Sequence, residues 1–262
     1  MSVKAGCLFA LTTALALTAN ACTVSAARVA RVSEAPRRCL GGLVQTANDA
    51  KHYAGCAEVE GDLRIDDAAL SDLSDFSSLQ SVLGALVVTH NSELSDLTGL
   101  ENLRAVDRLE IGNNPGLSNL NALQALRSAP IVEIRNNPEL ETLRGLGGLE
   151  RVDALELVND GLIDTSGLDP LREVGELTVA DNARLISLHG LNGVTRARSV
   201  QIRNNRLLCA QLGFLPQLGE VSSQLVLTSN PGVSKREIDG LRQHVKPAFE
   251  RPIVLGGELA LH

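Results

Sequence analysis

A short pattern of apolar and polar positions recurs along most of the chain. In residues 109–123, LEIGNNPGLSNLNAL, Leu109 and Ile111 have the period of two that is typical of a strand with one buried face. Leucines at every third position follow, and they predict short segments that turn corners and return the chain to its start. Successive copies lie 22–25 residues apart, which indicates a solenoid. Eight copies begin at Leu63, Leu86, Leu109, Val132, Leu155, Leu177, Val200 and Leu225.

A polar column accompanies the apolar one, five residues after most strand starts. An inward amide has two donors and one acceptor, so it can bond backbone groups that a tight turn leaves unpaired. Identical amides in successive copies can also bond one another as a ladder. We expect a structural ladder; an Asn-lined ligand site is the alternative. The column is Asn91, Asn114, Asn137, Asp160, Asn182, Asn205 and Asn230.

These residues resemble a known family. L-x-x-L-x-L-x-x-N is similar to a leucine-rich repeat, but here the continuation is mostly N-x-x-L, with NNP at 113–115 and 136–138. That spacing is closer to the receptor L domain, the ligand-binding module of insulin- and EGF-type receptor ectodomains that also occurs in fungal and bacterial surface proteins. CAEVEGDLRI at 56–65 resembles the opening of such a domain, and NNRLLC at 204–209 its closing motif. The resemblance implies a mainly β fold, a short right-handed β-helix over residues 39–233. No kinase, Cys-rich module or receptor membrane helix accompanies it, so only the scaffold is carried over.

The N-terminus resembles an export signal. Lys4 is followed by an apolar stretch at 8–17 that is too short to span a bilayer as a helix. Ala19-Asn20-Ala21 before Cys22 forms an A-x-A cleavage site and also resembles a bacterial lipobox, although Ala19 replaces the usual Leu. We predict a signal over 1–21 with lipidation of Cys22, and simple cleavage after Ala21 or Ala27 is the alternative. The protein is then an outer-membrane or cell-surface lipoprotein, or otherwise secreted or periplasmic.

A flexible linker is predicted over residues 22–38, which lack apolar periodicity. Cys39 and Cys56 come next, and in an exported protein we expect them to form a disulfide that fastens the N-terminal cap. A metal site there would need more ligands than His52, the one histidine between them. Cys209 has no evident partner, and we interpret it as a buried free thiol.

A C-terminal cap is predicted over residues 234–262. Ser234 and Glu237 have the spacing of a capping box, which predicts a short helix at 234–244 over the last coil. The stretch PIVLGGELAL at 252–261 predicts a final strand.

Net charge and motifs exclude several functions. The formal net charge is −7, and the absence of a basic stripe argues against nucleic acid as a partner. The five histidines lie in different repeats or at the termini, without alignment to Ser, Cys or a carboxylate in a triad. The nucleophile elbow, the P-loop, the zinc-protease motif and the EF-hand are absent, so we expect neither catalysis nor a cofactor or metal. The one candidate for calcium is an acidic cluster in the first coil, which we interpret as solvated charge: Asp62, Asp66, Asp67, Asp72 and Asp75.

The outward side of the strands offers a candidate ligand face. Glu110, Glu133 and Glu156 occupy the second strand position of consecutive copies, so they form an acidic stripe with a spacing of about 4.8 Å. Because like charges that close repel, we expect Arg135 and Arg203, or a cationic partner, to offset them. The stripe either keeps the sheet soluble or contacts a ligand.

The sequence as a whole predicts a non-catalytic binding or adhesion protein of the cell envelope with a protein or glycan ligand. A structural envelope protein without a discrete ligand is the alternative. A β-helix enzyme acting on carbohydrate is a third interpretation, favoured only by the acidic stripe.

Overall fold

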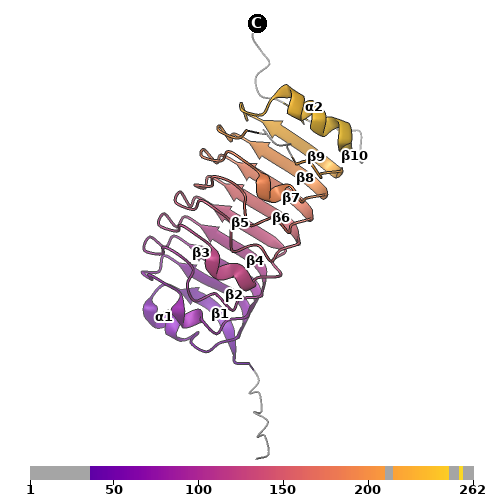
Figure 1. The fold of residues 1–262 in the computed structure, drawn as a ribbon. Coiled ribbons are helices and arrows are strands. Elements are labelled where there is room, and N and C mark those ends of the chain that lie inside the picture. Colours follow the sequence, from indigo (N-terminus) through magenta and orange to yellow (C-terminus); the bar gives the residue numbers. More distant parts are fainter. Residues whose placement is uncertain (1–35, 210–214, 248–253, 256–262) are drawn as a thin grey trace, which may run out of the picture. The chain divides into compact units, whose positions relative to one another are not determined.

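The computed structural model describes residues 36–209, 215–247 and 254–255. In these residues eleven strands form one parallel sheet, with the chain returning between strands through loops and short helices (Figure 1). Each coil places its strand beside that of the preceding coil, so strand order follows sequence order from β1 to β10. The predicted β-solenoid with a short helix near the C-terminus is confirmed. Its strands are β1 (Arg38–Val44), β2 (Glu58–Asp66), β3 (Ser81–Thr89), β4 (Ala105–Gly112), β5 (Ile131–Arg135), β6 (Arg151–Val158), β7 (Glu173–Ala180), β8 (Arg196–Arg203), β9 (Glu220–Thr228), β10 (Lys246–Pro247) and β11 (Val254–Leu255).

The core is a stack of aliphatic side chains. In the coil of β4 the strand contributes Leu109 and Ile111, and the return path contributes leucines at every third position, all without exposed surface. Burying each such side chain stabilises the fold by about 1.5–3 kcal/mol. The return path is punctuated by short 3₁₀ helices, because the spacing of three matches three residues per turn. These are η1 (Ser74–Phe76), η2 (Asn121–Ala125) and η3 (His189–Leu191).

Adjacent coils approach so closely that some corners require glycine. Gly99 has a φ of +113°, and a Cβ there would lie 1.9 Å from the carbonyl oxygen of Leu73 in the preceding coil. Gly167 has a φ of +108°, and a Cβ there would lie 2.3 Å from the carbonyl oxygen of Leu143. A side chain at either corner would therefore force neighbouring coils apart.

The N-terminal cap contains a strand that the repeat pattern did not predict. β1 pairs in parallel with β2, with Gly42 and Val44 opposite Leu63 and Ile65. Gly42 thus occupies the place of a strand leucine, and the hydroxyl oxygen of Tyr53 lies 3.0 Å from where its Cβ would be. The ring of Tyr53 stacks on Phe76, with centroids 5.5 Å apart. An aromatic side chain from the return segment therefore replaces the missing aliphatic one.

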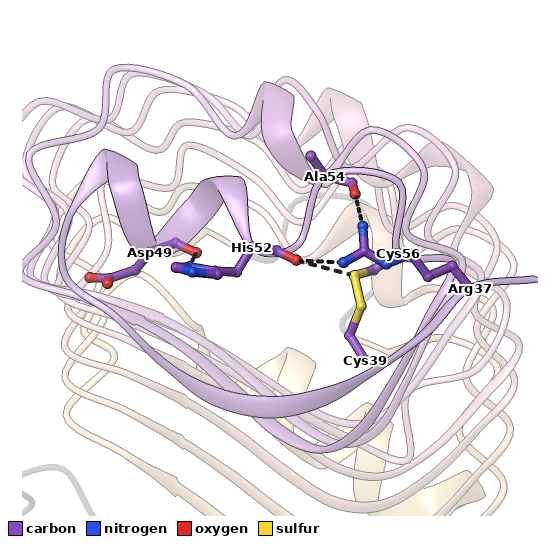
Figure 2. The surroundings of a disulfide bond; sticks show 6 residues. All are labelled: Arg37, Cys39, Asp49, His52, Ala54 and Cys56. Atoms are coloured by element: carbon purple, nitrogen blue, oxygen red, sulfur yellow. Dashed lines mark hydrogen bonds between the residues drawn. A yellow bond between two sulfur atoms is a disulfide. The ribbon is translucent and has the colours of Figure 1, made fainter.

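The disulfide between Cys39 and Cys56 closes this first coil, as Figure 2 shows. Helix α1 (Ala47–Lys51) lies between the two cysteines and begins at Thr46, whose capping box includes Asp49. The guanidinium of Arg37 donates to the carbonyl oxygens of Ala54, at 2.5 Å, and His52, at 3.3 Å. The last two residues of the predicted linker, Arg37 and Arg38, therefore belong to the cap.

At the other end, helix α2 (Lys235–His244) begins where predicted. Ser234 accepts from the backbone N–H of Glu237, and the Glu237 carboxylate accepts from the backbone N–H of Ser234 at 2.7 Å. Leu241 and Val245 join the core, so the helix contributes apolar cover to the last coils. β10 and β11 both pair with β9; β11 lies within the predicted final strand, most of which falls outside the described residues.

Candidate functional site

The buried polar column forms a continuous ladder of amides inside the solenoid. In the coil of β4, the Asn114 side chain donates through Nδ2 to the carbonyl oxygen of Val88 at 2.9 Å, and its Oδ1 accepts from the backbone N–H of Asn91 at 3.0 Å. The same two bonds recur in most coils, and the amides of neighbouring Asn residues also bond each other. Because these bonds satisfy the backbone where each strand ends, the column is structural. It has no exposed surface at Asn91, Asn114, Asn137, Asn182 and Asn205.

Asp160 is the exception in this column. Its Oδ1 accepts from the backbone N–H and the side-chain Nδ2 of Asn137, at 2.9 and 3.0 Å. Its Oδ2 is buried without a hydrogen-bond partner, whereas the Nδ2 of each neighbouring Asn donates to a strand carbonyl. Burial disfavours the carboxylate and raises the pKa of Asp160 to about 7, against the opposing effect of the bonds from Asn137. A proton on Oδ2 would supply the donor that an Asn supplies in the other coils.

The outer face of the sheet carries a zigzag of ion pairs. Strand register places Glu110, Glu133 and Glu156 side by side on β4, β5 and β6, as the pattern predicted. Nη2 of Arg108 lies 2.6 Å from Oε2 of Glu133 and 3.7 Å from Oε2 of Glu110. Nη2 of Arg135 lies 2.5 Å from Oε2 of Glu133 and 3.1 Å from Oε2 of Glu156. We call these five residues the charged zigzag; its two guanidinium groups hold three carboxylates together.

The predicted basic partners of this stripe need correction. Arg135 offsets the stripe as expected, but Arg203 does not, because it lies on β8, which β7 separates from Glu156. It forms no ion pair with the described residues. The second basic partner is Arg108, which sequence reasoning missed. The available signal was its position two residues before Glu110, since side chains at i and i+2 of a strand share a face.

The charged zigzag is flanked by apolar side chains on the same face. Ile131 is paired with Arg108 and with Ala154, and Val158 lies beside Arg135. All three apolar residues are half-buried. The centre of the face therefore combines charge with apolar surface, and it contains the predicted site residues Glu110, Glu133, Glu156 and Arg135.

Comparison with known proteins assigns part of this region. Residues 55–145 match the receptor L domain family. The match confirms the predicted resemblance and covers β2 to β5, including Arg108, Glu110, Glu133 and Arg135. Searches of curated proteins and of solved structures gave no significant match. The receptor L domain match suggests a ligand-binding extracellular domain, and together with the disulfide it suggests an exported protein.

Cys22, proposed as the lipidated residue, lies outside the described residues, as does the whole predicted signal. Cys209 is exposed rather than buried, contrary to expectation, and its thiol is free. No helix among the described residues is long and apolar enough to cross a membrane.

The aspartates of the first coil are distributed over separate hydrogen bonds. Oδ1 of Asp62 accepts from the backbone N–H of Ala85 at 2.8 Å, and Oδ1 of Asp72 accepts from that of Ser74 at 2.9 Å. Across the described residues, His, Cys, Asp and Glu nowhere gather in threes as a metal site requires. From the sequence we interpret these aspartates as solvated charge; in the structure Asp62 and Asp72 also bond backbone groups of the first coils.

Two histidines among the described residues pair with carboxylates, which the sequence reasoning missed: Nδ1 of His189 lies 3.7 Å from Oδ1 of Asp169, and His90 makes the closer contact. Nδ1 of His90 lies 2.9 Å from Oδ1 of Asp66, and the Thr89 hydroxyl donates to the same oxygen at 2.7 Å. These bonds, first the one from Thr89, lower the pKa of Asp66. The hydroxyl is bonded to the carboxylate and not to the imidazole, so the trio lacks the nucleophile–base contact of a triad.

His90 also belongs to a column of non-glycine residues in the left-handed conformation, one directly after each of β2 to β9, with φ between 52° and 61°. Asn and Asp tolerate this conformation best, which explains the paired Asn residues in the pattern. Exposed amides of the column form a second ladder: Nδ2 of Asn136 donates to Oδ1 of Asn113 at 2.9 Å, and Nδ2 of Asn159 to Oδ1 of Asn136 at 2.8 Å.

Proposed function

We propose that this protein is a non-catalytic, exported binding protein that holds a protein or glycan ligand against the outer face of its sheet. The observation that carries the proposal is the charged zigzag. Arg108 and Arg135 use only Nη2 for their ion pairs, and Nη1 of either forms no hydrogen bond with the described residues. A guanidinium has five donors, so both side chains retain donors for the acceptor oxygens of a ligand.

The exposure of the charged zigzag supports the same role. The side chains of Arg108 and Arg135 are 40% and 38% exposed, and that of Glu133 only 12%. Glu133 anchors both guanidinium groups, while their outer sides face solvent. This arrangement holds the donors in place before a ligand arrives, which reduces the entropy lost on binding. The neighbouring Ile131 and Val158 supply apolar contact.

A binding screen tests this function. The purified full chain is applied to a glycan array and to a panel of surface proteins, and hits are titrated. We compare Glu110→Gln/Glu133→Gln/Glu156→Gln with Glu93→Gln/Glu139→Gln/Glu141→Gln, which makes the same change in net charge at exposed turn positions. We expect binding to weaken by about tenfold or more in the first variant alone. Unchanged binding by the first variant, or release of cleaved product from a glycan hit, contradicts the proposal.

We further propose that Cys22 anchors the protein to the cell envelope. The A-x-A-C stretch after the apolar segment supports it, and a lipidated cysteine with more than one chain anchors stably. Intact mass and membrane fractionation of the wild type and Cys22→Ser test it. A lipid-sized mass increment, with release of the variant from membranes, is expected; an unmodified N-terminus in the soluble fraction contradicts the anchor.

A further inference from the structure

The first strand of the sheet has a free edge. β1 pairs with β2 on one side, and none of the described residues pairs with its other side. Alternate N–H and C=O groups of such an edge remain able to pair with another strand, and natural proteins commonly protect long edges with charge or proline. β1 has seven residues, RCLGGLV, and only Arg38 among them is charged.

Two large apolar side chains stand exposed on this strand. Leu40 is 76% exposed and Leu43 is 52% exposed. Residues three apart in a regular strand face opposite sides, but a register shift between Leu40 and Gly42 changes the alternation. Leu40 therefore lies opposite Glu60 and Leu43 opposite Arg64, and both leucines share the outer face of the sheet.

The order Leu40-Gly41-Gly42-Leu43 reads the same in both directions. When two copies of β1 pair antiparallel about the midpoint of the two glycines, Leu40 of each copy lies opposite Leu43 of the other. Side chains directly opposite in an antiparallel pair lie on the same face. Because the register shift in β1 places Leu40 and Leu43 on the same face, the four leucines of the two copies would pack against one another.

We propose that β1 is a homodimerisation edge, at which two copies of this chain pair antiparallel and continue one sheet through both molecules. Charge is compatible with this pairing, because Arg38 faces Gln45 of the second copy and Arg37 faces Thr46. No like charges are brought into opposition along the strand. The hydroxyl group of Tyr53 lies beside the strand at Gly42.

The dimer is expected to be reversible and dependent on concentration, because a seven-residue edge and four leucines form a small interface compared with obligate dimers. It brings two outer sheet faces onto one surface. A ligand with repeated epitopes would then be held at two sites, which raises its apparent affinity without new contacts. The dimer itself does not depend on the proposed ligand.

Sedimentation velocity of the full chain over a range of concentrations tests the proposal. Leu40→Thr/Leu43→Thr keeps β-forming residues at both exposed positions and removes the apolar cover. Leu207→Thr is the matched control, since Leu207 is 53% exposed and follows β8, far along the chain from β1. We expect the double variant to raise the dimer dissociation constant by about tenfold or more and the control to leave it unchanged. Circular dichroism and thermal melting confirm that both remain folded.

A charge exchange tests the register. Leu40→Lys/Leu43→Glu places opposite charges across each pair and beside Glu60 and Arg64, so the dimer should persist. Leu40→Lys/Leu43→Lys places like charges across the pair and should dissociate it. A wild type that stays monomeric at every concentration overturns the proposal, as does a double threonine variant that associates like the wild type. A monomer whose β1 amides exchange slowly with deuterium also overturns it, by showing that the N-terminal segment covers the edge.

Discussion

The inside and the outside of the same coils use polar groups in opposite ways. Inside, Asn114 has no exposed surface, and its amide bonds backbone groups of two coils. Outside, about two fifths of the side-chain surface of Arg108 and Arg135 is exposed to solvent. Both guanidinium groups also have N–H donors that take no part in their ion pairs. A buried amide that loses its partners destabilises the fold, whereas an exposed ion pair contributes little. We infer that the interior ladder carries stability and that the outer face is free to bind.

The largest effect should come from breaking the interior ladder. Asn114→Ala leaves the backbone N–H of Asn91 and the carbonyl oxygen of Val88 without partners in a dry core. We expect unfolding in urea to show a loss of about 2–5 kcal/mol, since each unsatisfied buried group costs about 1–3 kcal/mol. The control is Asn113→Gly, which removes an exposed amide and keeps the left-handed turn. An Asn114→Ala variant as stable as this control contradicts the structural role of the ladder.

Within the ladder, Asp160 differs from the Asn residues because its effect on the stability of the protein depends on pH. Its folded pKa of about 7 exceeds the unfolded value, so the folded state binds the extra proton and the wild type loses stability as pH rises from about 4 to about 7. Above pH 7 the penalty is constant, with an upper bound on the order of 4 kcal/mol.

Asp160→Asn should therefore stabilise the protein most above pH 7 and little below pH 4. Urea unfolding of both proteins across this range measures the difference. A difference in stability that does not vary with pH would show that Asp160 is not the titrating group. No charged residue bonds to this carboxyl group: its described hydrogen bonds come from the backbone N–H and the Nδ2 of Asn137.

The smallest effect on stability should come from the charged zigzag. Arg108→Met/Arg135→Met removes four ion pairs from a half-exposed face, and we expect a loss of about 0.5–1 kcal/mol for the network in chemical unfolding. Salt screens exposed charges, so this loss should shrink in high salt. A loss as large as that of Asn114→Ala would show that the outer face also holds the fold together.

Much of this architecture could be predicted because the same pattern of apolar and polar positions occurs in eight copies. The L-x-I period gave the strand register that places Glu110, Glu133 and Glu156 side by side. The cap could not be predicted in the same way, because β1 has Gly42 where each of β2 to β9 has an aliphatic residue. The residue that fills the gap, Tyr53, comes from a segment outside the repeat.

The candidate site was predicted only in part for a related reason. A column on the sheet can be recognised from the sequence when most repeats have the same type of residue at that position. Arg108 is the one basic residue in its column, so the alignment of the repeats did not single it out. His90 and Asp66 come from neighbouring columns of different coils, and their contact depends on the left-handed turn at His90. The periodicity of the sequence predicts the geometry that all coils share. It does not predict contacts made by residues that occur in one coil alone.

One titration tests the division between a structural interior and a binding exterior most directly. A ligand identified by the binding screen is titrated against the wild type, Glu110→Gln/Glu133→Gln/Glu156→Gln and Asp160→Asn, and the melting temperature of each is recorded at pH 8. The account predicts that the triple variant loses binding by about tenfold or more and melts close to the wild type, whereas Asp160→Asn melts higher and binds unchanged. Unchanged binding by the triple variant, or altered binding by Asp160→Asn, would contradict it.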